Sequence, residues 1–301
     1  MRIVSVGEIL WDVIGDREYL GGAPLNFAAH ARQLGHNVCL LSAVGDDDRG
    51  RRALERLEER GISNQFVQAL RGKNTGIAEV ELDAEGKPMF RIVRPAAYDF
   101  VDLTAAELER IAKLLPQWIY LGTLYHMSAQ AMASTLKLLE AVPGARRFYD
   151  VNLRDGNWSL AVVEQLSAQA HVVKFSDSEA EFLDGSVNSG GQGSSMEHFC
   201  RRWSEQYGCK TICVTFGERG CAVFHRGQYC EVPGFKVQVA DTVGAGDAFA
   251  AAFLHGIEQG WDARHIGRFA NAVGALVASR AGATPEWHID ECQSMLELNT
   301  A

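Results

Sequence analysis

The sequence lacks the long hydrophobic segments and the excess of basic residues that mark membrane and nucleic-acid-binding proteins. Its first apolar stretch, residues 2–9, contains Glu8 and is followed by Asp12, so it is too short for a signal peptide or a membrane-spanning helix. The 38 acidic residues outnumber the 29 Lys and Arg residues, which gives a formal net charge of −9. No general basic field can attract nucleic acid or an anionic membrane, so neither is expected as a partner. Any anionic ligand must be bound by a local site.

Cysteine and histidine occur without the spacings that would give them a special role. The seven cysteines include no C-x-x-C pair, and Cys39, Cys213 and Cys221 lie in apolar, strand-like segments. Such thiols are typical of small core residues in a reducing compartment, so we expect a cytoplasmic location. The nine histidines show no H-E-x-x-H spacing, which argues against a built-in zinc site.

Apolar runs alternate with segments of helical spacing along most of the chain. The runs predict strands at 2–9, 37–44, 117–122, 146–151, 170–176 and 210–216. Helices are predicted between and after them, with the clearest ends at Ala23–Leu34, Arg49–Arg60, 246–259 and 262–281. This alternation predicts an α/β fold of βαβ units with a central, mainly parallel sheet.

Two segments depart from that alternation. Residues 75–95 alternate apolar and polar side chains around the turn residues 83–86, which predicts an antiparallel hairpin. Together with an extended segment at 12–20, the hairpin can form a small separate sheet that acts as a lid or as a dimer surface. The Gly/Ser-rich segment 185–195 is interpreted as a surface loop.

The strongest chemical signal is the segment DTVGAGDAF at 241–249. Gly244, Ala245 and Gly246 open an apolar helix, and the free N–H groups at such a helix start can bind a phosphoryl group. Asp247 follows in the first turn, where it can accept a proton from a hydroxyl nucleophile; the alternative is an acid that merely caps the helix. The chain has no P-loop motif and no dinucleotide-binding fingerprint.

Two signatures give the chain a family resemblance. The segments GGAPLNFAAHARQLGHNVCLLSAVGDDDRG at 21–50 and DTVGAGDAF at 241–249 resemble the signature regions of the ribokinase-like (PfkB) carbohydrate kinases, in the right order and at the right separation. The resemblance implies one domain over residues 1–301, with a central parallel sheet flanked by helices. It also implies a small β lid formed by about 12–20 and 75–98.

The resemblance assigns a sugar site. Asp12 resembles an early acid that binds sugar hydroxyls, and Gly22 and Asn26 match the family's sugar contact. A carboxylate and an amide suit a polyol, because each can bond two hydroxyl groups. Arg94 is placed to reach the sugar from the lid, and Asp247 is expected to contact the hydroxyl that it deprotonates.

The resemblance also assigns a nucleotide site. TFGERG at 215–220 is similar to the family's T-x-G-x-x-G loop, which implies that Thr215, Gly217 and Gly220 line the phosphates of ATP beside Gly246. Asn271 matches a residue near the adenine.

Four further residues are assigned to phosphate and metal binding by resemblance. DVNLR at 150–154 is similar to the D-x-N-x-R of fructokinases and ketodeoxygluconate kinases, which places Arg154 near substrate and phosphate. Ser176 stands where the family's N-x-x-E motif has Asn, while Glu179 is kept and is expected to hold Mg²⁺ through water. Asp241 matches the loop that binds a monovalent cation such as K⁺ in some members.

The implied activity is ATP-dependent transfer of a phosphoryl group to a primary hydroxyl of a ketose. Ile92 and Val93 replace the paired tyrosines of many ketodeoxygluconate kinases, which favours a neutral ketose such as fructose. The alternatives are 2-keto-3-deoxygluconate, ribose or a nucleoside as substrate, or a non-catalytic sugar-binding relative, for which Ser176 is the argument. A homodimer formed through the lid is expected.

Overall fold

The structure is a computed structural model, and it describes residues 1–82, 88–187 and 195–298. The predicted turn at 83–86 and most of the Gly/Ser-rich segment 185–195 lie outside these residues.

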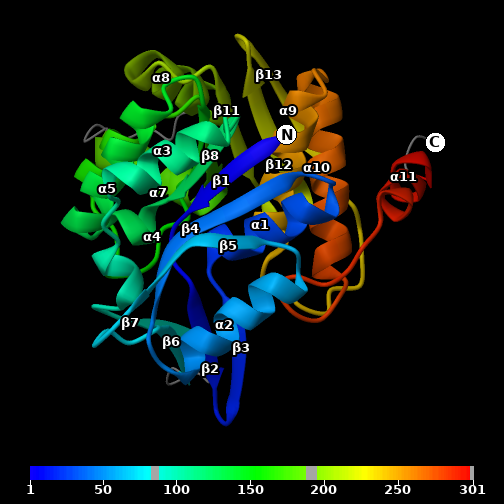
Figure 1. The fold of residues 1–301 in the computed structure, drawn as a ribbon. Helices are drawn as coiled ribbons and strands as arrows, with labels where there is room; N and C mark the ends of the chain where they lie inside the picture. Colours follow the sequence, from blue (N-terminus) through cyan, green and yellow to red (C-terminus); the bar gives the residue numbers. More distant parts are fainter. Residues whose placement is uncertain (83–87, 188–194, 299–301) are drawn as a thin grey trace.

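Within the described residues, a nine-stranded main sheet runs through the molecule (Figure 1). From one edge to the other, its strands are β5 (Ser63–Leu70), β4 (Asn37–Gly45), β1 (Arg2–Val6), β8 (Trp118–Gly122), β9 (Arg146–Asp150), β10 (Val172–Ser176), β11 (Thr211–Thr215), β12 (Gly220–His225) and β13 (Gln228–Pro233). Every neighbouring pair from β5 to β11 is parallel, and the β11–β12 and β12–β13 pairs are antiparallel. The mainly parallel sheet expected from the alternating pattern is therefore confirmed.

One predicted strand is shorter than expected. The apolar run 2–9 is not a single strand, because β1 ends at Val6 and the next strand begins at Leu10. A Cβ atom added to Gly7 would lie 2.3 Å from Cγ of Pro24, so a helix start packs directly on the chain at this point. The chain leaves the main sheet here and enters a second one.

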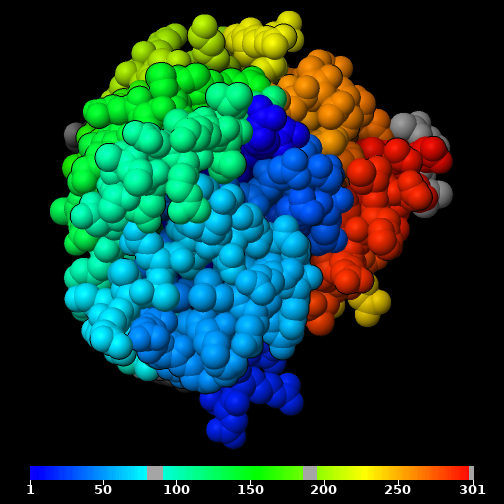
Figure 2. Space-filling model, viewed as in Figure 1, coloured from blue at the N-terminus to red at the C-terminus, as the bar shows by residue number. Residues whose placement is uncertain are grey.

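This second sheet has four strands within the described residues, in the order β3 (Arg17–Gly21), β2 (Leu10–Ile14), β6 (Gly76–Leu82) and β7 (Pro88–Val93). We call it the small sheet. The predicted 75–95 hairpin is confirmed as the antiparallel β6–β7 pair, and the extended 12–20 segment lies in the β2–β3 pair. The β2–β3 hairpin projects beyond the body of the molecule (Figure 2).

Helices cover both faces of the main sheet (Figure 1). One face is packed by α1 (Ala23–Gln33), α2 (Asp48–Glu59), α9 (Ala245–Glu258) and α10 (Ala263–Ala278), with α11 (Ile289–Leu298) beside α10. The other is packed by α3 (Ala105–Lys113), α5 (Ala129–Ala141), α6 (Leu160–Ser167), α7 (Asp177–Val187) and α8 (Met196–Tyr207), and the short α4 (Thr123–His126) follows β8.

The core consists of one large apolar cluster on each face of the main sheet. Phe27, Phe148 and Phe253 belong to the first cluster, and Phe175 and Trp203 belong to the second. All seven cysteines are free, and six of them are buried, as expected for core residues. Among the described residues, no helix has the length and apolar character needed to cross a membrane.

Candidate active site

Two residues that stand 221 positions apart meet at one end of the main sheet. Asn26 lies on α1 and Asp247 lies in the first turn of α9, and these two helices pack against each other. The Asn26 Nδ2 atom donates a hydrogen bond of 2.9 Å to Oδ2 of Asp247. The two signature segments of the sequence therefore form one site.

The start of α9 offers free backbone donors to an anion. Gly244 precedes the helix with a φ of +79°, and a Cβ atom there would lie 2.0 Å from the carbonyl oxygen of Ala283, so only glycine fits. The N–H groups of Gly246 and Asp247 have no acceptor among the described residues. Such donors at a helix start can bind the oxygens of a phosphoryl group.

The carboxylate of Asp247 has the properties of a base that works near neutral pH. Burial, followed by the negative charge of Asp150, raises its pKa to about 7. The hydrogen bond from Asn26 and the charges of Lys174 and Arg154 act in the opposite direction. In the described part of the chain, the carboxylate accepts no backbone N–H, so Asp247 does not cap the helix. A carboxyl group of this pKa can accept a proton at physiological pH.

Two charged residues below Asp247 were not identified from the sequence. Nζ of Lys174 donates to both carboxylate oxygens of Asp150, at 2.9 and 3.1 Å, and the Tyr120 hydroxyl donates to Oδ2 of Asp150 at 3.0 Å. All three residues are buried. The sequence did contain one signal for this pair. Lys174 lies inside an apolar strand, and a buried lysine requires a partner of opposite charge.

The predicted sugar residue Asp12 lies on β2, against Gly21 of the neighbouring strand. A Cβ atom on Gly21 would lie 2.8 Å from Oδ2 of Asp12, and one on Gly22 would lie 2.4 Å from the carbonyl oxygen of Glu8. Gly21 therefore leaves room for the carboxylate, and Gly22 lets the chain pass close to the backbone of Glu8. Burial raises the pKa of Asp12 to about 6, and the charge of Arg154 partly offsets the rise.

A second acid, Glu8, lies beneath this region and was missed by the sequence analysis. Its Oε1 accepts the N–H of Ala23 at 3.2 Å, whereas Oε2 is buried without a partner among the described residues. Burial raises its pKa to about 7. A buried oxygen without a hydrogen bond lowers the stability of the fold. We therefore infer that a ligand hydroxyl or a water donates a hydrogen bond to Oε2 of Glu8. The only signal in the sequence was an acid directly after a buried strand.

The two predicted arginines differ in availability. The guanidinium group of Arg94 pairs with the carboxylate of Asp99 and donates to the carbonyl oxygen of Leu124 at 2.9 Å. Arg154 is exposed, and its guanidinium group has no hydrogen-bond or ion-pair partner in the described part of the chain. Its charge nevertheless acts on Glu8, Asp12 and Asp247. Arg154 is therefore the guanidinium group available to a ligand.

A cavity of about 960 Å³ begins at Gly246 and extends between α9, α10 and the end of the main sheet. Of the residues assigned to the nucleotide site, it is lined by Thr215, Gly217, Gly220, Gly246 and Asn271. The 234–239 segment also lines it, which the sequence analysis did not foresee because nothing in that segment marks a binding loop. The volume suits a ligand of nucleotide size.

Asn271 has an indirect part in this cavity. Its Nδ2 donates to the carbonyl oxygens of Val232 and Pro233, both at 3.1 Å. Both amide protons are therefore used to hold the end of β13, where the 234–239 segment begins. Asn271 shapes the cavity wall through this contact.

Ser176 and Glu179 form a reciprocal cap at the start of α7. The Glu179 carboxylate accepts the N–H of Ser176 at 2.7 Å and the N–H of Leu153 at 2.6 Å, and Oγ of Ser176 accepts the N–H of Glu179 at 3.2 Å. This cap fixes the chain just before Arg154. Among the described residues, no three His, Cys, Asp or Glu side chains form a group that could hold a metal ion.

Asp241, which the resemblance assigned to a monovalent cation, joins its own loop to the loop at Gly282. Its Oδ1 accepts the N–H of Val243 at 3.0 Å, and its Oδ2 accepts the N–H of Gly282 at 3.1 Å. Ala283, in the second loop, is the residue that approaches Gly244. The loop pair therefore supports the start of α9.

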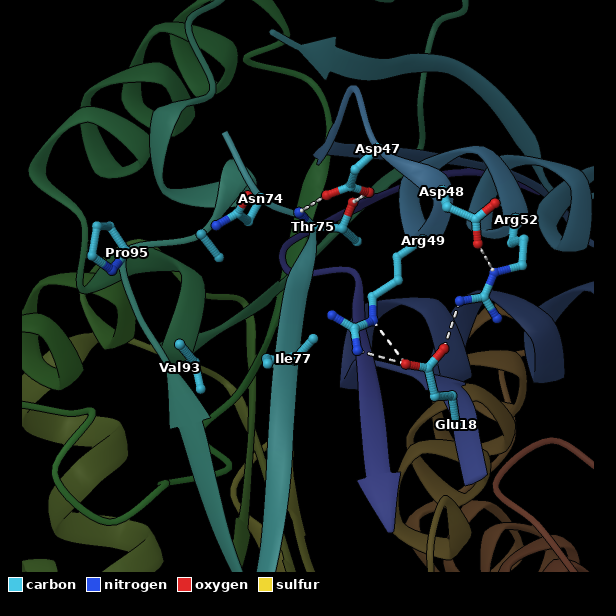
Figure 3. Close-up of a pocket in the computed structure, with 11 residues that line it drawn as sticks. Glu18, Asp47, Asp48, Arg49, Arg52, Asn74, Thr75, Ile77, Val93 and Pro95 are labelled. Atoms are coloured by element: carbon cyan, nitrogen blue, oxygen red, sulfur yellow. Dashed lines mark hydrogen bonds and ion pairs between the residues drawn. The ribbon is translucent and has the colours of Figure 1, made fainter. Parts of the chain in front are cut away.

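A second cavity, of about 540 Å³, lies between α2 and the small sheet (Figure 3). Ile77 and Val93 line it from the face of the small sheet opposite to Asp12, because neighbouring strand residues point to opposite faces. The carboxylate of Glu18 lies between the guanidinium groups of Arg49 and Arg52 and pairs with both, at 2.6 and 2.5 Å (Figure 3). We call these three residues the latch, since they join the small sheet to α2.

The sequence matches a known family along nearly its whole length. The profile described as "pfkB family carbohydrate kinase" matches residues 3–289. Fructokinase-1 of Oryza sativa subsp. japonica is 33% identical over 280 residues, which cover 88% of this chain and 84% of the relative.

Solved structures have the same fold. The fructokinase of Xylella fastidiosa with bound ATP superposes with a TM-score of 0.85 at 24% identity, covering 100% of this chain and 99% of that one. The fructokinase of Vibrio cholerae O395 with fructose, ADP and calcium bound superposes with a TM-score of 0.81 at 25% identity, covering 98% of both chains. The ribokinase-like α/β fold expected from the sequence is thereby confirmed.

Proposed function

This chain belongs to the pfkB family of carbohydrate kinases, and from that premise we propose that it transfers the γ-phosphoryl group of ATP to a primary hydroxyl of fructose. The observation that carries the proposal is the position of Asp247. Its partly buried carboxylate lies between Asn26, on the sugar side, and Gly246, where the nucleotide-sized cavity begins. A base at that junction can act on a hydroxyl that faces the last phosphate of a bound nucleotide.

The reaction uses the residues as follows. Asp12 and Asn26 bind hydroxyl groups of the sugar and orient it, and the Asp247 carboxylate accepts the proton of the attacking hydroxyl. A bond forms between that oxygen and the γ-phosphorus while the bond to the β-phosphate oxygen of ATP breaks, which releases ADP. The free N–H groups of Gly246 and Asp247 stabilise the charge on the transferred phosphoryl group.

A neutral substrate is supported by the charges around the sugar site. Glu8, Asp12 and Asp247 gather there, and the guanidinium group of Arg94 is neutralised by Asp99. A sugar acid would meet three carboxyl groups with only Arg154 to balance its charge. The fructokinase relative and the fructose-bound structural neighbour point in the same direction.

One observation favours the second candidate, 2-keto-3-deoxygluconate. Arg154 is exposed and its side chain makes no hydrogen bond or ion pair within the described residues, so the guanidinium group can pair with a substrate carboxylate. We assign Arg154 to the phosphate of ATP instead. The Glu179 carboxylate binds the N–H of Leu153, the residue before Arg154, and so holds this part of the chain near the start of α7.

Magnesium and a monovalent ion fit this proposal in different places. Bound Mg²⁺ would offset the charge of the phosphates. The Glu179 carboxylate keeps unused lone pairs beyond its two N–H contacts, so it can accept a hydrogen bond from a metal-bound water. Asp241 and the loop carbonyls around it supply oxygen donors of the kind that K⁺ binds.

A sugar panel tests the proposed activity. The purified protein is assayed with ATP, Mg²⁺ and each of fructose, 2-keto-3-deoxygluconate, ribose and a nucleoside, and ADP release is coupled to a spectroscopic readout. We expect the highest kcat/KM with fructose. A tenfold or greater preference for the keto acid would reassign Arg154 to its carboxylate, and the absence of turnover with every sugar would favour the non-catalytic alternative.

We also propose that two copies associate through the small sheet, in the cytoplasm. Ile14 and Tyr19 lie on the projecting β2–β3 hairpin (Figure 2), and each is 47% exposed. Large apolar side chains at the edge of a sheet are typical of a surface that a second subunit covers. Light scattering at micromolar concentration should give the mass of a dimer, and Ile14→Asp should give that of a monomer. A monomeric wild type would contradict the proposal.

A further inference from the structure

A buried ion pair lies directly below the proposed base. Lys174 on β10 is 7% exposed and Asp150 on β9 is 1% exposed, and the two are neighbours in the main sheet. The Lys174 ammonium contacts both carboxylate oxygens of Asp150, at 2.9 and 3.1 Å. The Tyr120 hydroxyl from β8 donates a third hydrogen bond to that carboxylate. The pair is thus fixed by contacts from three adjacent strands.

The pair also lies close to the start of α9. A Cβ atom added to Gly246 would lie 3.8 Å from Nζ of Lys174, so the ammonium group is beneath the residue that precedes Asp247. Although burial disfavours its charge, the carboxylates of Asp150 and Glu179 raise the pKa of Lys174 above its ordinary value. The ammonium group of Lys174 and the carboxylate of Asp150 therefore lie side by side under the base.

Stability does not explain this arrangement. Removing two charges from water costs about as much as their attraction returns, so a buried ion pair adds little to the free energy of unfolding. An apolar pair would fill the same space at this position of the sheet. The distinctive consequence of the pair is electrostatic, because its members act on Asp247 in opposite directions: Asp150 disfavours a second carboxylate nearby and Lys174 favours it.

We propose that Lys174 is a positioning residue of the phosphoryl-transfer site, whose ammonium group neutralises Asp150 and so keeps Asp247 available as an ionised base. The inference builds on the proposed role of Asp247. It adds a role for Lys174, which lies outside both signature segments, 21–50 and 241–249.

Several charged or polar groups face Asp247, and they come from different elements. They are Glu8 after β1, Asn26 on α1, Asp150 on β9, Arg154 after β9 and Lys174 on β10, with Tyr120 on β8. Arg154 acts on Glu8, Asp12 and Asp247 together. Lys174, by contrast, acts on Asp247 and is bound directly to Asp150. A change at Lys174 therefore reports on the base.

The test measures the ionisation of Asp247 directly. The protein is labelled with ¹³C at the aspartate carboxyl carbons, and the Asp247 signal is assigned by its loss in Asp247→Asn. We expect the midpoint of that signal to rise by about one pH unit or more in Lys174→Met, because a favourable opposite charge is removed. In Asp150→Asn the midpoint should fall, because the like charge is removed. If Lys174→Met does not fold, Asp150→Asn tests the same balance from the other partner.

A matched control and a kinetic measurement complete the design. Lys137→Met removes the same charge from an exposed pair with Asp102, whose atoms lie 3.2 Å apart, and should leave the midpoint unchanged. The acid limb of the pH profile of kcat/KM for fructose should move with the signal of Asp247 in each variant.

The outcomes separate this inference from the proposed function. If the midpoint moves as expected while no sugar is phosphorylated, the charge balance holds and the proposed function fails. Midpoints within about 0.2 pH units of wild type in both Lys174→Met and Asp150→Asn, with only a lower melting temperature, would overturn the inference and leave a structural ion pair.

Discussion

The phosphate end of the site and its sugar end are built from different groups. The phosphate end consists mainly of backbone: N–H groups at the start of α9 and the glycines of the 215–220 turn, with the cavity of about 960 Å³ between them. Arg154 is the charged side chain that we assign to it. The sugar end consists of side chains, above all the carboxyl groups of Glu8 and Asp12 and the amide of Asn26. A phosphate needs many donors in a fixed arrangement, whereas a polyol needs groups that accept and donate.

The difference determines how each end responds to substitution. Backbone donors cannot be removed by a side-chain change, so apart from Arg154 the phosphate end should tolerate substitutions that do not alter its glycines. At the sugar end each contact with the substrate is made by one side chain. Replacing that side chain should change the KM for the sugar and leave the KM for ATP unchanged. Asp247 belongs to both ends, because it contacts Asn26 and follows Gly246.

The largest effect is expected at the junction. Asp247→Asn should lower kcat by a factor on the order of 10²–10⁴, because an amide cannot accept the proton of the sugar hydroxyl. ATP should still bind, since the backbone donors remain, and calorimetry with a non-hydrolysable analogue checks this. Turnover close to that of the wild type would show that another group is the base.

A substitution at the sugar end should separate the two ends. Asp12→Asn should raise the KM for fructose on the order of tenfold to hundredfold, because hydrogen bonds to a charged carboxylate are replaced by weaker ones. The KM for ATP should stay within about twofold. Asp16→Asn is the matched control, since Asp16 is exposed in the turn after β2. An equal change in both KM values would contradict the separation.

As the pH falls, activity should be lost first through protonation of Asp247, at the junction of the two ends. Because the pKa of Asp247 is raised to about 7, the base gains a proton as the pH falls through that value. We expect kcat/KM for fructose to fall about tenfold per pH unit below that point, because this parameter reports the pKa of the free enzyme. Steady-state assays from pH 5 to 8 in buffers of constant ionic strength measure the limb. A flat profile down to pH 5 would exclude Asp247 in the role of base.

A smaller effect is expected at the cap formed by Ser176 and Glu179 at the start of α7. Glu179→Gln should raise the Mg²⁺ concentration needed for half-maximal rate several-fold, and more than it changes the KM for fructose. The amide can no longer accept the N–H groups of both Leu153 and Ser176 and the metal-bound water together. Glu181→Gln, exposed on the same helix, is the control. Unchanged Mg²⁺ dependence in Glu179→Gln would remove the metal role from this residue.

The smallest effect is expected at the latch. Glu18→Gln should raise the KM for fructose about twofold to threefold, because partly exposed ion pairs contribute up to about 1 kcal/mol. The small sheet that carries Asp12 would then be joined to α2 less tightly. Glu55→Gln breaks an exposed pair with Arg51 on the same α2 and should change nothing. An effect on the KM for ATP instead would show that the latch does not act on the sugar end.

The two ends also differ in how far the sequence predicts them. At the phosphate end, Gly244–Asp247 form one short segment of sequence and the 215–220 turn forms another. Short motifs are therefore enough to predict them, and the structure brings both segments to the same cavity. The α/β fold followed from periodicity in the same way.

At the sugar end, prediction from sequence was incomplete. The resemblance identified Asn26, but the Arg94–Asp99 pair, which commits the arginine, arises only from tertiary packing. The Lys174–Asp150 pair was missed because the pairing of β9 and β10 creates it. Likewise, the run 2–9 looked like one strand, since the contact of Gly7 with Pro24 is invisible in an apolar pattern.

The central claim is that this site transfers phosphate from ATP to a neutral ketose, and one competition measures it. Equal concentrations of fructose and 2-keto-3-deoxygluconate are incubated with ATP, Mg²⁺ and the wild-type protein, and the phosphate esters are followed by ³¹P NMR. The ratio of the two products equals the ratio of the kcat/KM values at equal substrate concentrations. We predict at least a tenfold excess of fructose phosphate. A dominant keto-acid phosphate, or inorganic phosphate with no sugar ester, would contradict the account.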